Sequence, residues 1–568
     1  MRPVSPRIAI PALSWLLAAA LPAAAQNMPS PQERPTIDLD GIFASIAPTG
    51  PGCVAGVKSA GTASLTRGYG LADLEHPSAL TADSVFETGS VAKQFTAAAM
   101  LMLVQDGKLT LDDDIRRYLP EMPDYGTAVT IRHLLTHTSG LREQWSLLAL
   151  AGNPPGSQVH TQATILDLAS RQKGLNFTPG AEFLYTNTNY ALAAIIIERV
   201  SGTSLQRFTD QRLFRPLGMS HSRWREDFRT VVPGRAMAYA SAGDGFIASM
   251  PFTNVYGNGG LLTTIGDLLR WNAFLDHPSE LPGGEALVAR LQTPGTLSNG
   301  VALEYALGLE VTRTHGLRMV SHSGSTGGYK TWLGRYPEKG ISVAVLCNNG
   351  GVDPVGLGEK VAEQALLAEG LAMGHSDGEI AASALRPAAT APHGDLTRYQ
   401  GLFRNPVTGE LVEMKVVDHR LTLQQGGSQI LIFDHGQRFR RADGDSVQFA
   451  GATGRPVSVT FEHAGARQRF IAVAPARTDD NALAAYVGTY YSAELDTRIA
   501  VVRQGQALVM RQPFAVEWAL TPRFDNGFTT RLRGTTTFVF TRKPNGKIDG
   551  FAAWANGVRN MRFVRQFR

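Results

Sequence analysis

The pattern of apolar residues changes once along this 568-residue chain, near residue 380. Before that point, segments with apolar residues every three or four positions mix with runs that alternate at every second position, which predicts amphipathic helices among strands. After it, short alternating strands are separated by Gly, Asn and Asp turns, with one helical turn near 481–486. We therefore expect a mixed α/β domain followed by all-β structure.

Two further features divide the chain into domains. Residues 381–394 are rich in Ala, Pro, Thr and Ser and predict a linker after an α/β domain at 35–380. Beyond it, the stretch that begins at Leu396 (LTRYQGLF) is echoed by the stretch that begins at Leu483 (LAAYVGTY). Because closure into a barrel removes strand edges, we expect two small β-barrel domains, at 395–475 and 480–568.

Residues 1–25 have the pattern of a signal peptide. Arg2 and Arg7 precede an apolar run at 8–21, which ends in three alanines before Gln26. The alternative is an uncleaved anchor helix, but the run is shorter than the ~20 apolar residues that a spanning helix needs. The sequence predicts a secreted, periplasmic protein with no integral membrane segment after cleavage of the signal.

Composition excludes several classes of protein. A net charge of +5 without a basic stripe argues against nucleic-acid binding. Two cysteines cannot form a Cys-rich zinc site, and we expect neither a metal nor another cofactor. Cys53 opens one predicted strand and Cys347 closes another, so they could pair if these strands are antiparallel neighbours. Buried free thiols are the favoured interpretation.

The strongest local signal is Ser90-Val91-Ala92-Lys93, at the start of a predicted helix from Ser90 to Gly107. Positions i and i+3 lie on one helix face, so the hydroxyl and the amine are within reach of each other. A helix N-terminus stabilises an oxyanion, and burial lowers the pKa of a lysine so that its neutral amine can take a serine proton. These residues predict a nucleophile and its base.

Two more short motifs follow in the chain. Tyr185-Thr186-Asn187 precedes a predicted helix at 190–200, on a loop where a phenol can relay a proton and an amide can hold substrate or the lysine. Tyr256-Gly257-Asn258 competes, but its glycines indicate a flexible turn. His322-Ser323-Gly324-Ser325 lies on a predicted strand before a hairpin at 330–346, where small residues let substrate lie against the backbone and the 325 N–H completes an oxyanion hole.

In this order, the three motifs resemble those of the penicillin-recognising serine hydrolases, over about residues 40–370. The most similar branch holds class C β-lactamases, related esterases and D-stereospecific aminopeptidases. The resemblance implies an antiparallel sheet flanked by helices plus an all-helical lobe. A catalytic domain followed by two barrels is similar to the D-aminopeptidase arrangement in particular, in which a loop of the last barrel reaches the active site.

The resemblance also implies residue roles. Ser90 would be the acyl-enzyme nucleophile, and Lys93 and Tyr185 would share the base and acid work. Substrate or the oxyanion would be bound by Asn187, His322, Ser323, Gly324 and Ser325. The oxyanion would sit between the backbone N–H groups of Ser90 and Ser325. Penicillin binders have lysine where this chain has His322, and a largely neutral histidine does not suit a substrate carboxylate.

The sequence therefore predicts a serine hydrolase that cleaves a small amide or ester, with D-aminopeptidase-like hydrolysis favoured and peptidoglycan-derived peptides among its candidate substrates. A carboxylesterase or β-lactamase of the same fold is the alternative. A non-catalytic peptidoglycan- or penicillin-binding protein is the alternative of another class.

Three other patterns are interpreted as structural or chance matches. Ser170-x-x-Lys173 lies at the polar end of a predicted helix, and Gly374-x-Ser376-x-Gly378 lacks the strand that a nucleophile elbow requires. His133 and His137 have leucine where a zinc-binding H-E-x-x-H motif has glutamate, so we expect helix and cap roles.

Overall fold

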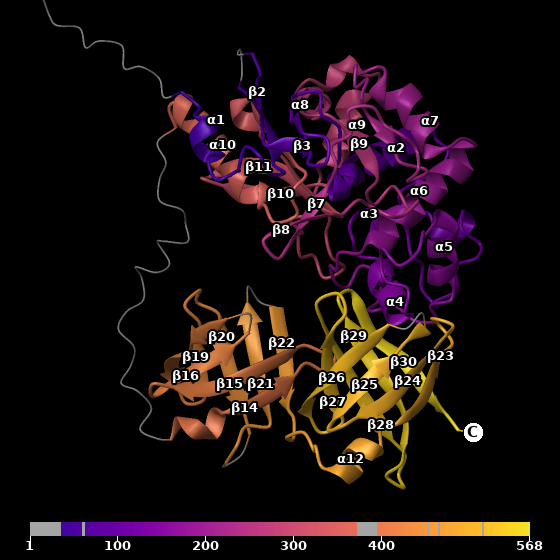
Figure 1. Cartoon of the computed structure of the whole chain (residues 1–568), viewed down its shortest axis with the longest axis vertical. Helices are drawn as coiled ribbons and strands as arrows, with labels where there is room; N and C mark the ends of the chain where they lie inside the picture. Colours follow the sequence, from indigo (N-terminus) through magenta and orange to yellow (C-terminus); the bar gives the residue numbers. More distant parts are fainter. Residues whose placement is uncertain are drawn as a thin grey trace, which may run out of the picture.

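The computed structural model of the protein describes residues 36–59, 63–371, 395–425, 427–451, 454–463, 466–513 and 516–567. An α/β part lies above two all-β parts that stand side by side (Figure 1). The expected fold class, a β-lactamase-like α/β domain followed by two barrel domains, is confirmed. The predicted signal segment, the predicted linker and the Gly374-x-Ser376-x-Gly378 pattern lie outside the described residues.

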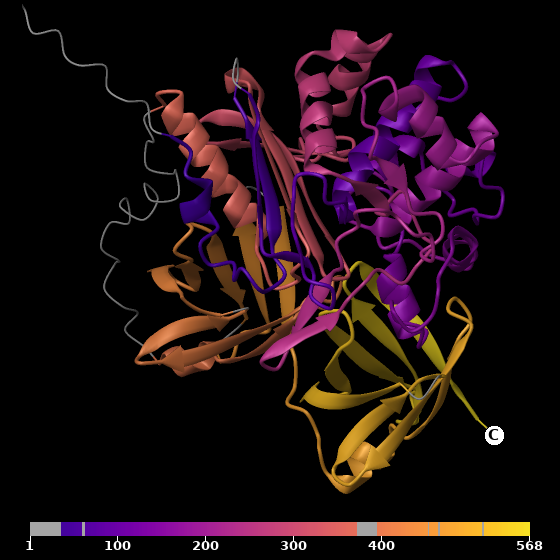
Figure 2. The ribbon, with the colours of Figure 1, turned by 45° about the horizontal axis from the view of Figure 1, so that its top comes forward.

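A six-stranded antiparallel sheet forms the centre of the α/β part. Its strands run in the order β10 (Glu310–Thr314), β11 (Leu317–Thr326), β12 (Tyr329–Tyr336), β13 (Ile341–Cys347), β1 (Cys53–Lys58) and β2 (Leu65–Tyr69). Helix α10 (Pro354–Ala368) covers one face, as Figure 2 shows, and α8 (Ile265–Asp276) covers the other. Since both faces are covered, β13 is buried along its whole length. The predicted hairpin is β12–β13.

The helical lobe is built around α2 (Lys93–Gln105), which is buried on all sides from its first residue to Leu103. A helix that is apolar all round belongs in the middle of a bundle. The other helices of the lobe are α3 (Ile131–Leu135), α4 (Gln144–Leu150), α5 (Gln162–Ser170), α6 (Asn187–Ser201), α7 (Leu205–Thr209) and α9 (Gly284–Leu291), whereas α1 (Leu39–Ile42) packs beside α10. Helix α6 ends at Ser201, and the next residue, Gly202, caps it with a φ of 71°.

Short strands connect the lobe to the sheet. They are β3 (Leu71–Asp73), β4 (Ser78–Ala79), β5 (Phe86–Glu87), β6 (Arg223–Trp224), β7 (Tyr239–Ala242), β8 (Gly245–Ala248) and β9 (Leu261–Thr263). Strand β9 pairs with both β5 and β6. This small sheet fixes the segment that leads directly into Ser90.

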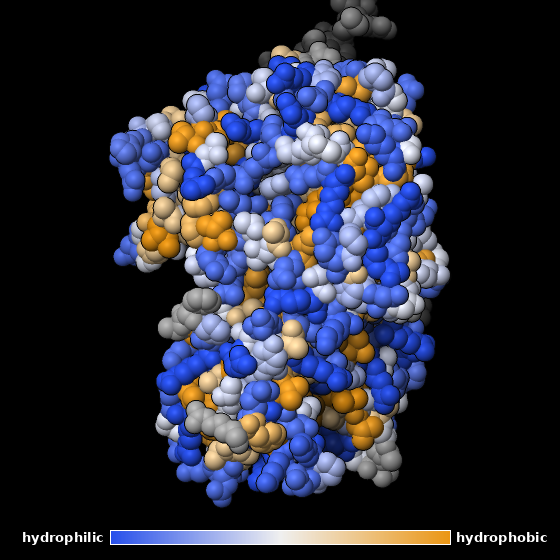
Figure 3. Space-filling view, turned by 90° about the vertical axis from the view of Figure 1, so that its right-hand side faces the viewer, coloured by the Kyte–Doolittle hydropathy of each residue, from blue (hydrophilic) through white to orange (hydrophobic). Residues whose placement is uncertain are grey.

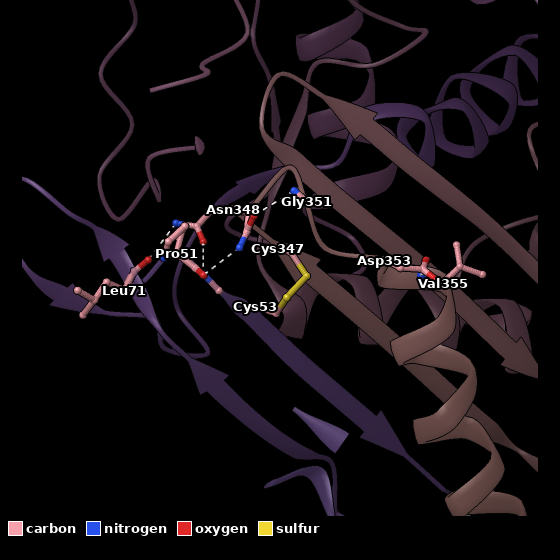
Figure 4. The surroundings of a disulfide bond; sticks show 10 residues. Pro51, Cys53, Leu71, Cys347, Asn348, Gly351, Asp353 and Val355 are labelled. Atoms are coloured by element: carbon pink, nitrogen blue, oxygen red, sulfur yellow. Dashed lines mark hydrogen bonds between the residues drawn. A yellow bond between two sulfur atoms is a disulfide. The ribbon is translucent and has the colours of Figure 1, made fainter. Parts of the chain in front are cut away.

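A disulfide bond joins Cys53 to Cys347, and the favoured interpretation of two free thiols was wrong (Figure 4). Strands β1 and β13 are antiparallel neighbours, and their register places the two cysteines directly opposite each other, with Cα atoms 3.9 Å apart. Both residues are completely buried. The bridge therefore links two neighbouring strands, β1 and β13, which come first and last in the chain among the strands of this sheet.

The first β part, β14 to β22, is a nine-stranded sheet whose edge strands β17 and β18 follow each other in the chain, so it is nearly closed. Its strands are β14 (Gly401–Arg404), β15 (Leu411–Val417), β16 (Arg420–Gln424), β17 (Ser428–Ile430), β18 (Ile432–His435), β19 (Arg438–Arg440), β20 (Ser446–Ala450), β21 (Ser458–His463) and β22 (Ala466–Ala472). It has its own apolar core of aromatic and aliphatic side chains.

The second β part is a closed barrel that follows a short helix, α12 (Asp480–Ala484). Its strands are β23 (Gly488–Ser492), β24 (Thr497–Gln504), β25 (Ala507–Arg511), β26 (Glu517–Phe524), β27 (Gly527–Arg531), β28 (Thr535–Arg542), β29 (Ile548–Ala555) and β30 (Val558–Gln566). Apolar residues of α4 and α5 share one core cluster with this barrel. The barrel is thus packed into the α/β part.

The surface shows no large apolar face on the side drawn in Figure 3, where hydrophobic residues form separate small groups among polar ones. Within the described ranges, no helix has both the length and the apolar character needed to cross a bilayer.

Candidate active site

Ser90 lies in a 3-10 turn, η1 (Gly89–Ala92), which continues into α2. This turn packs against the end of β11, and two glycines make the close approach feasible. A Cβ on Gly89 would lie 2.5 Å from the Ser325 nitrogen, and one on Gly324 would lie 2.0 Å from the Thr88 oxygen. Gly89 also has a φ of 52°, which favours glycine. The fold thereby brings the Ser90 and Ser325 main chains together.

Lys93 is completely buried one turn below Ser90. Its Nζ lies 3.0 Å from Ser90 Oγ, 2.9 Å from Asn187 Oδ1 and 2.7 Å from the Asn258 carbonyl oxygen. Burial lowers the pKa of this lysine well below its usual value, against an opposing effect of the Glu143 charge. Burial therefore shifts the equilibrium of this side chain toward the neutral amine.

The three contacts of the amine determine where its lone pair points. The Asn258 carbonyl and the Asn187 amide oxygen can only accept hydrogen bonds, so each takes one of the two hydrogens of a neutral amine. The remaining lone pair faces Ser90 Oγ. An ammonium donates to Ser90 Oγ as well, whereas a neutral amine accepts from the serine hydroxyl, as a general base does from its nucleophile.

Tyr185 completes this group. Its hydroxyl is hydrogen-bonded to Ser90, and burial raises the pKa of the phenol above its usual value. The ring packs against His137 in a tilted arrangement with centroids 4.2 Å apart, and Lys93 Nζ lies 4.8 Å from the centroid of Tyr185. Tyr185 is therefore a protonated phenol, which can give a proton but not take one.

His322 lies behind Tyr185, with ring centroids 6.2 Å apart, and is fully buried. Its Nδ1 is 2.6 Å from the Ser323 carbonyl, which only accepts, so Nδ1 carries the proton and Nε2 accepts from the Tyr305 hydroxyl at 3.0 Å. Burial and the nearby Lys93 lower the pKa of His322 to about 3. The imidazole is therefore neutral, and both of its nitrogens are hydrogen-bonded to protein groups.

A cavity of about 410 Å³ opens over Ser90. Among the predicted site residues, Ser90, Asn187 and Ser325 line it, whereas Lys93, Tyr185, His322, Ser323 and Gly324 lie behind the lining. Glu87 and Arg225 form part of the wall and bind each other through two contacts of 2.8 and 2.9 Å. Within the described lining, Glu87 is the single carboxylate, and Arg235 also contacts it.

Sequence reasoning missed three contributors to the site. Asn258 lies in the motif set aside as a turn, and it supplies its backbone oxygen, while Tyr256 points away to Glu198 at 2.8 Å. Glu143 accepts a hydrogen bond from Asn187 Nδ2 at 3.0 Å. Arg533, in the loop between β27 and β28, reaches the cavity. No local motif marks Glu143 or Arg533. The resemblance to the D-aminopeptidase arrangement predicts a barrel loop at the active site, but not which residue of that loop reaches it.

The motifs interpreted as structural have structural contacts. The Ser170 hydroxyl ends α5 by bonding the Asp167 carbonyl, and His133 forms a capping box with Thr130. His137 follows α3 and accepts a hydrogen bond from the Thr186 amide. In the part of the chain that the structure describes, no group of three His, Cys, Asp or Glu side chains is placed to hold a metal.

Comparison with known proteins agrees with this geometry. The family model described as Beta-lactamase matches residues 47–366. A D-aminopeptidase of Brucella anthropi is 28% identical over 532 residues, 91% of this chain and 95% of the relative. A D-aminopeptidase of Brucella canis is 26% identical over 483 residues, 84% of this chain and 86% of that protein.

Solved structures share the fold. The D-amino acid amidase from Ochrobactrum anthropi SV3, complexed with L-phenylalanine, is 25% identical with a TM-score of 0.50, and the match covers 58% of this chain and 97% of that one. The octameric penicillin-binding protein homologue from Pyrococcus abyssi has a TM-score of 0.52 and 24% identity over 76% of this chain and 97% of that one, which supports the fold alone.

Proposed function

The chain belongs to the beta-lactamase family and is a serine hydrolase of it, and from this we propose that it cleaves small amides of D-amino acids through an acyl-enzyme on Ser90. The observation that carries the chemistry is the contact of 3.0 Å between Lys93 Nζ and Ser90 Oγ, with both amine hydrogens held by carbonyl oxygens. The substrate class rests on the names of the relatives, D-aminopeptidase and D-amino acid amidase.

The steps follow from the contacts. Ser90 Oγ attacks the carbonyl carbon of the substrate and its proton passes to the neutral Lys93 amine. Negative charge on the carbonyl oxygen of the substrate is stabilised by two backbone N–H groups, that of Ser90 and that of Ser325, which lies near the end of β11. The amine leaving group receives a proton from the Tyr185 phenol, which regains one from Lys93. Water then attacks the acyl-enzyme by the reverse route and releases the acid.

A second candidate, hydrolysis of an ester, is favoured by the cavity wall. An unpaired carboxylate is a strong partner for a free α-ammonium group, but Glu87, the one acid in the described lining, is already bound by Arg225 and Arg235. Arg533 adds a further cation at the cavity, without a hydrogen bond or ion pair to another described side chain. An acyl group without a charged amine fits this wall better.

Two experiments test these proposals. A fluorophosphonate should add one adduct mass to the protein and none to Ser90→Ala; an unlabelled wild type would favour the non-catalytic binding protein. Rates on D-alanyl anilide, L-alanyl anilide, nitrophenyl butyrate and a chromogenic cephalosporin should then be highest for D-alanyl anilide. Highest activity on the butyrate would select the esterase, and on the cephalosporin the β-lactamase.

We also propose that the protein is exported to the periplasm after cleavage before Gln26, on the basis of the charged, apolar and small-residue regions at 1–25. Mass spectrometry of the protein purified from a periplasmic extract should find a chain that starts at Gln26. A full-length chain in the membrane fraction would support an anchor instead.

A further inference from the structure

Glu143 has a carboxylate that is surrounded by hydrogen-bond donors and almost completely buried. Its Oε1 accepts from Asn187 Nδ2 at 3.0 Å, and its Oε2 accepts from the Ser146 backbone N–H at 2.8 Å. The Trp145 N–H also donates to it. Burial raises the pKa of this carboxyl above its usual value, and the hydrogen bonds from the three donors oppose that effect. All three partners donate, and an ionised carboxylate accepts from all of them.

This carboxylate determines which way the Asn187 amide faces. The NH2 group donates to Glu143, so the amide oxygen on the other side faces Lys93 Nζ at 2.9 Å. With the amide reversed, the amide oxygen would face a carboxylate oxygen, and the NH2 group would face the amine. The lone pair of a neutral Lys93 would then be drawn toward Asn187 and away from Ser90.

The second barrel holds Glu143 in place. The Glu143 N–H donates to the Gly557 carbonyl at 2.9 Å, in the turn between β29 and β30. On one side Arg142 pairs with Glu494 at 2.6 Å, and on the other Gln512 donates to the last carbonyls of α4, among them Leu150 at 2.8 Å. Helix α4 rests on the barrel in both Figures 1 and 2.

We propose that Glu143 is a positioning residue of the hydrolase: held by the C-terminal barrel, it fixes the Asn187 amide so that the Lys93 lone pair is directed at Ser90. The barrel is then part of the catalytic apparatus, although it contributes no group to the proton transfer. This inference rests on the function proposed for Ser90. The charged and titratable groups that face Glu143 are Lys93 from α2, Tyr185 before α6 and Arg533 from the barrel loop.

The test is Glu143→Gln, which keeps the size of the side chain and replaces one acceptor with a donor. The two backbone N–H groups are fixed in the first turn of α4 and should hold the glutamine oxygen, so its NH2 group faces Asn187. The Asn187 amide must then reverse. We expect fluorophosphonate to label Ser90 at least tenfold more slowly on the pH plateau, since a misdirected base loses much of a general-base effect of about 10²–10⁴-fold.

Two readouts separate positioning from stability. Loss of the Glu143 charge removes an effect that raises the pKa of Lys93, so the acidic limb of the labelling rate should move to lower pH in E143Q. In the double variant E143Q/N187D, the new carboxylate accepts from both neighbours, so labelling on the plateau should be faster than in E143Q and the limb should move to higher pH. A residue with only a structural role would change neither.

Asp267→Asn is the matched control, because Asp267 is also a buried carboxylate that accepts from donors, Ser222 Oγ and the His221 N–H, both at 2.9 Å. It lies outside the cavity lining, so D267N should lower the melting temperature without moving the labelling profile. Labelling of E143Q within twofold of wild type with the same acidic limb would overturn the inference. A wild-type protein that is not labelled at all would instead overturn the function proposed for Ser90.

Discussion

Replacement of Lys93 by methionine should separate stability from activity. The proposed general base requires a neutral Lys93 amine at pH 7 in the folded protein, whereas in the unfolded chain this lysine binds a proton up to its usual pKa of 10.5. Keeping it neutral over those 3.5 pH units costs about 5 kcal/mol, at about 1.36 kcal/mol for each unit. K93M removes this cost but leaves the Asn187 and Asn258 oxygens without a donor, at about 1–3 kcal/mol each.

The two effects nearly cancel at pH 7, so K93M should be about as stable as wild type there while losing about 10²–10⁴ of the labelling rate. The decisive quantity is how the difference in free energy of unfolding between wild type and K93M changes with pH. Because burial lowers the pKa of the folded lysine, the unfolded state binds the extra proton, and wild-type stability rises with pH. The free energy of unfolding of wild type relative to K93M should rise by about 1.4 kcal/mol per pH unit, or about 3 kcal/mol from pH 7 to 9.

Urea unfolding at pH 7, 8 and 9, followed by tryptophan fluorescence, measures this difference. K108M provides the control, because it makes the same substitution at an exposed lysine just beyond the end of α2. If the difference in free energy of unfolding between wild type and K93M stays constant from pH 7 to 9, the folded protein keeps Lys93 charged. Lys93 could then not act as the proposed general base.

Three further results are expected from other buried groups. Burial lowers the pKa of His322 to about 3 in the folded protein, so only the unfolded state gains a proton on this residue between pH 6.5 and pH 4. The free energy of unfolding lost between pH 7 and pH 4 should therefore be about 3 kcal/mol smaller in His322→Gln than in wild type. An equal loss in both proteins, measured by urea unfolding, would contradict this. The variant C53A/C347A should lose about 2–5 kcal/mol of stability, and alkylation of the denatured, unreduced wild type should find no free thiol; a reactive thiol there would refute the bridge. Arg225→Met leaves Glu87 with one partner and should cost about 3 kcal/mol, whereas R229M breaks a solvent-exposed pair with Asp227 and should cost much less; equal effects of the two variants would contradict the buried pair.

The sequence was sufficient where the geometry is local. Three residues of separation place Ser90 and Lys93 within reach of each other where a 3-10 turn runs into α2, and Pro337-Glu338-Lys339-Gly340 between two apolar runs specifies the β12–β13 hairpin. These arrangements depend on a few neighbouring residues, and the spacing alone encodes them.

Contacts between distant segments were not encoded in this way. The pairing of Cys53 with Cys347 requires the register of two strands 294 residues apart in the chain. Glu143 precedes a short helix without any motif, and its contact with Asn187 depends on a barrel turn at Gly557 that holds its backbone. Such contacts follow from the docking of whole domains, which no local pattern reveals.

Intact-mass analysis after treatment with a fluorophosphonate tests the activated alcohol itself. At pH 8 we predict a single adduct, located on Ser90 by peptide mapping, absent from Ser90→Ala and much slower to form in Lys93→Met. Adduct formation at another residue, or equal labelling of wild type and K93M, would contradict the assignment of a serine activated by the buried amine beneath it.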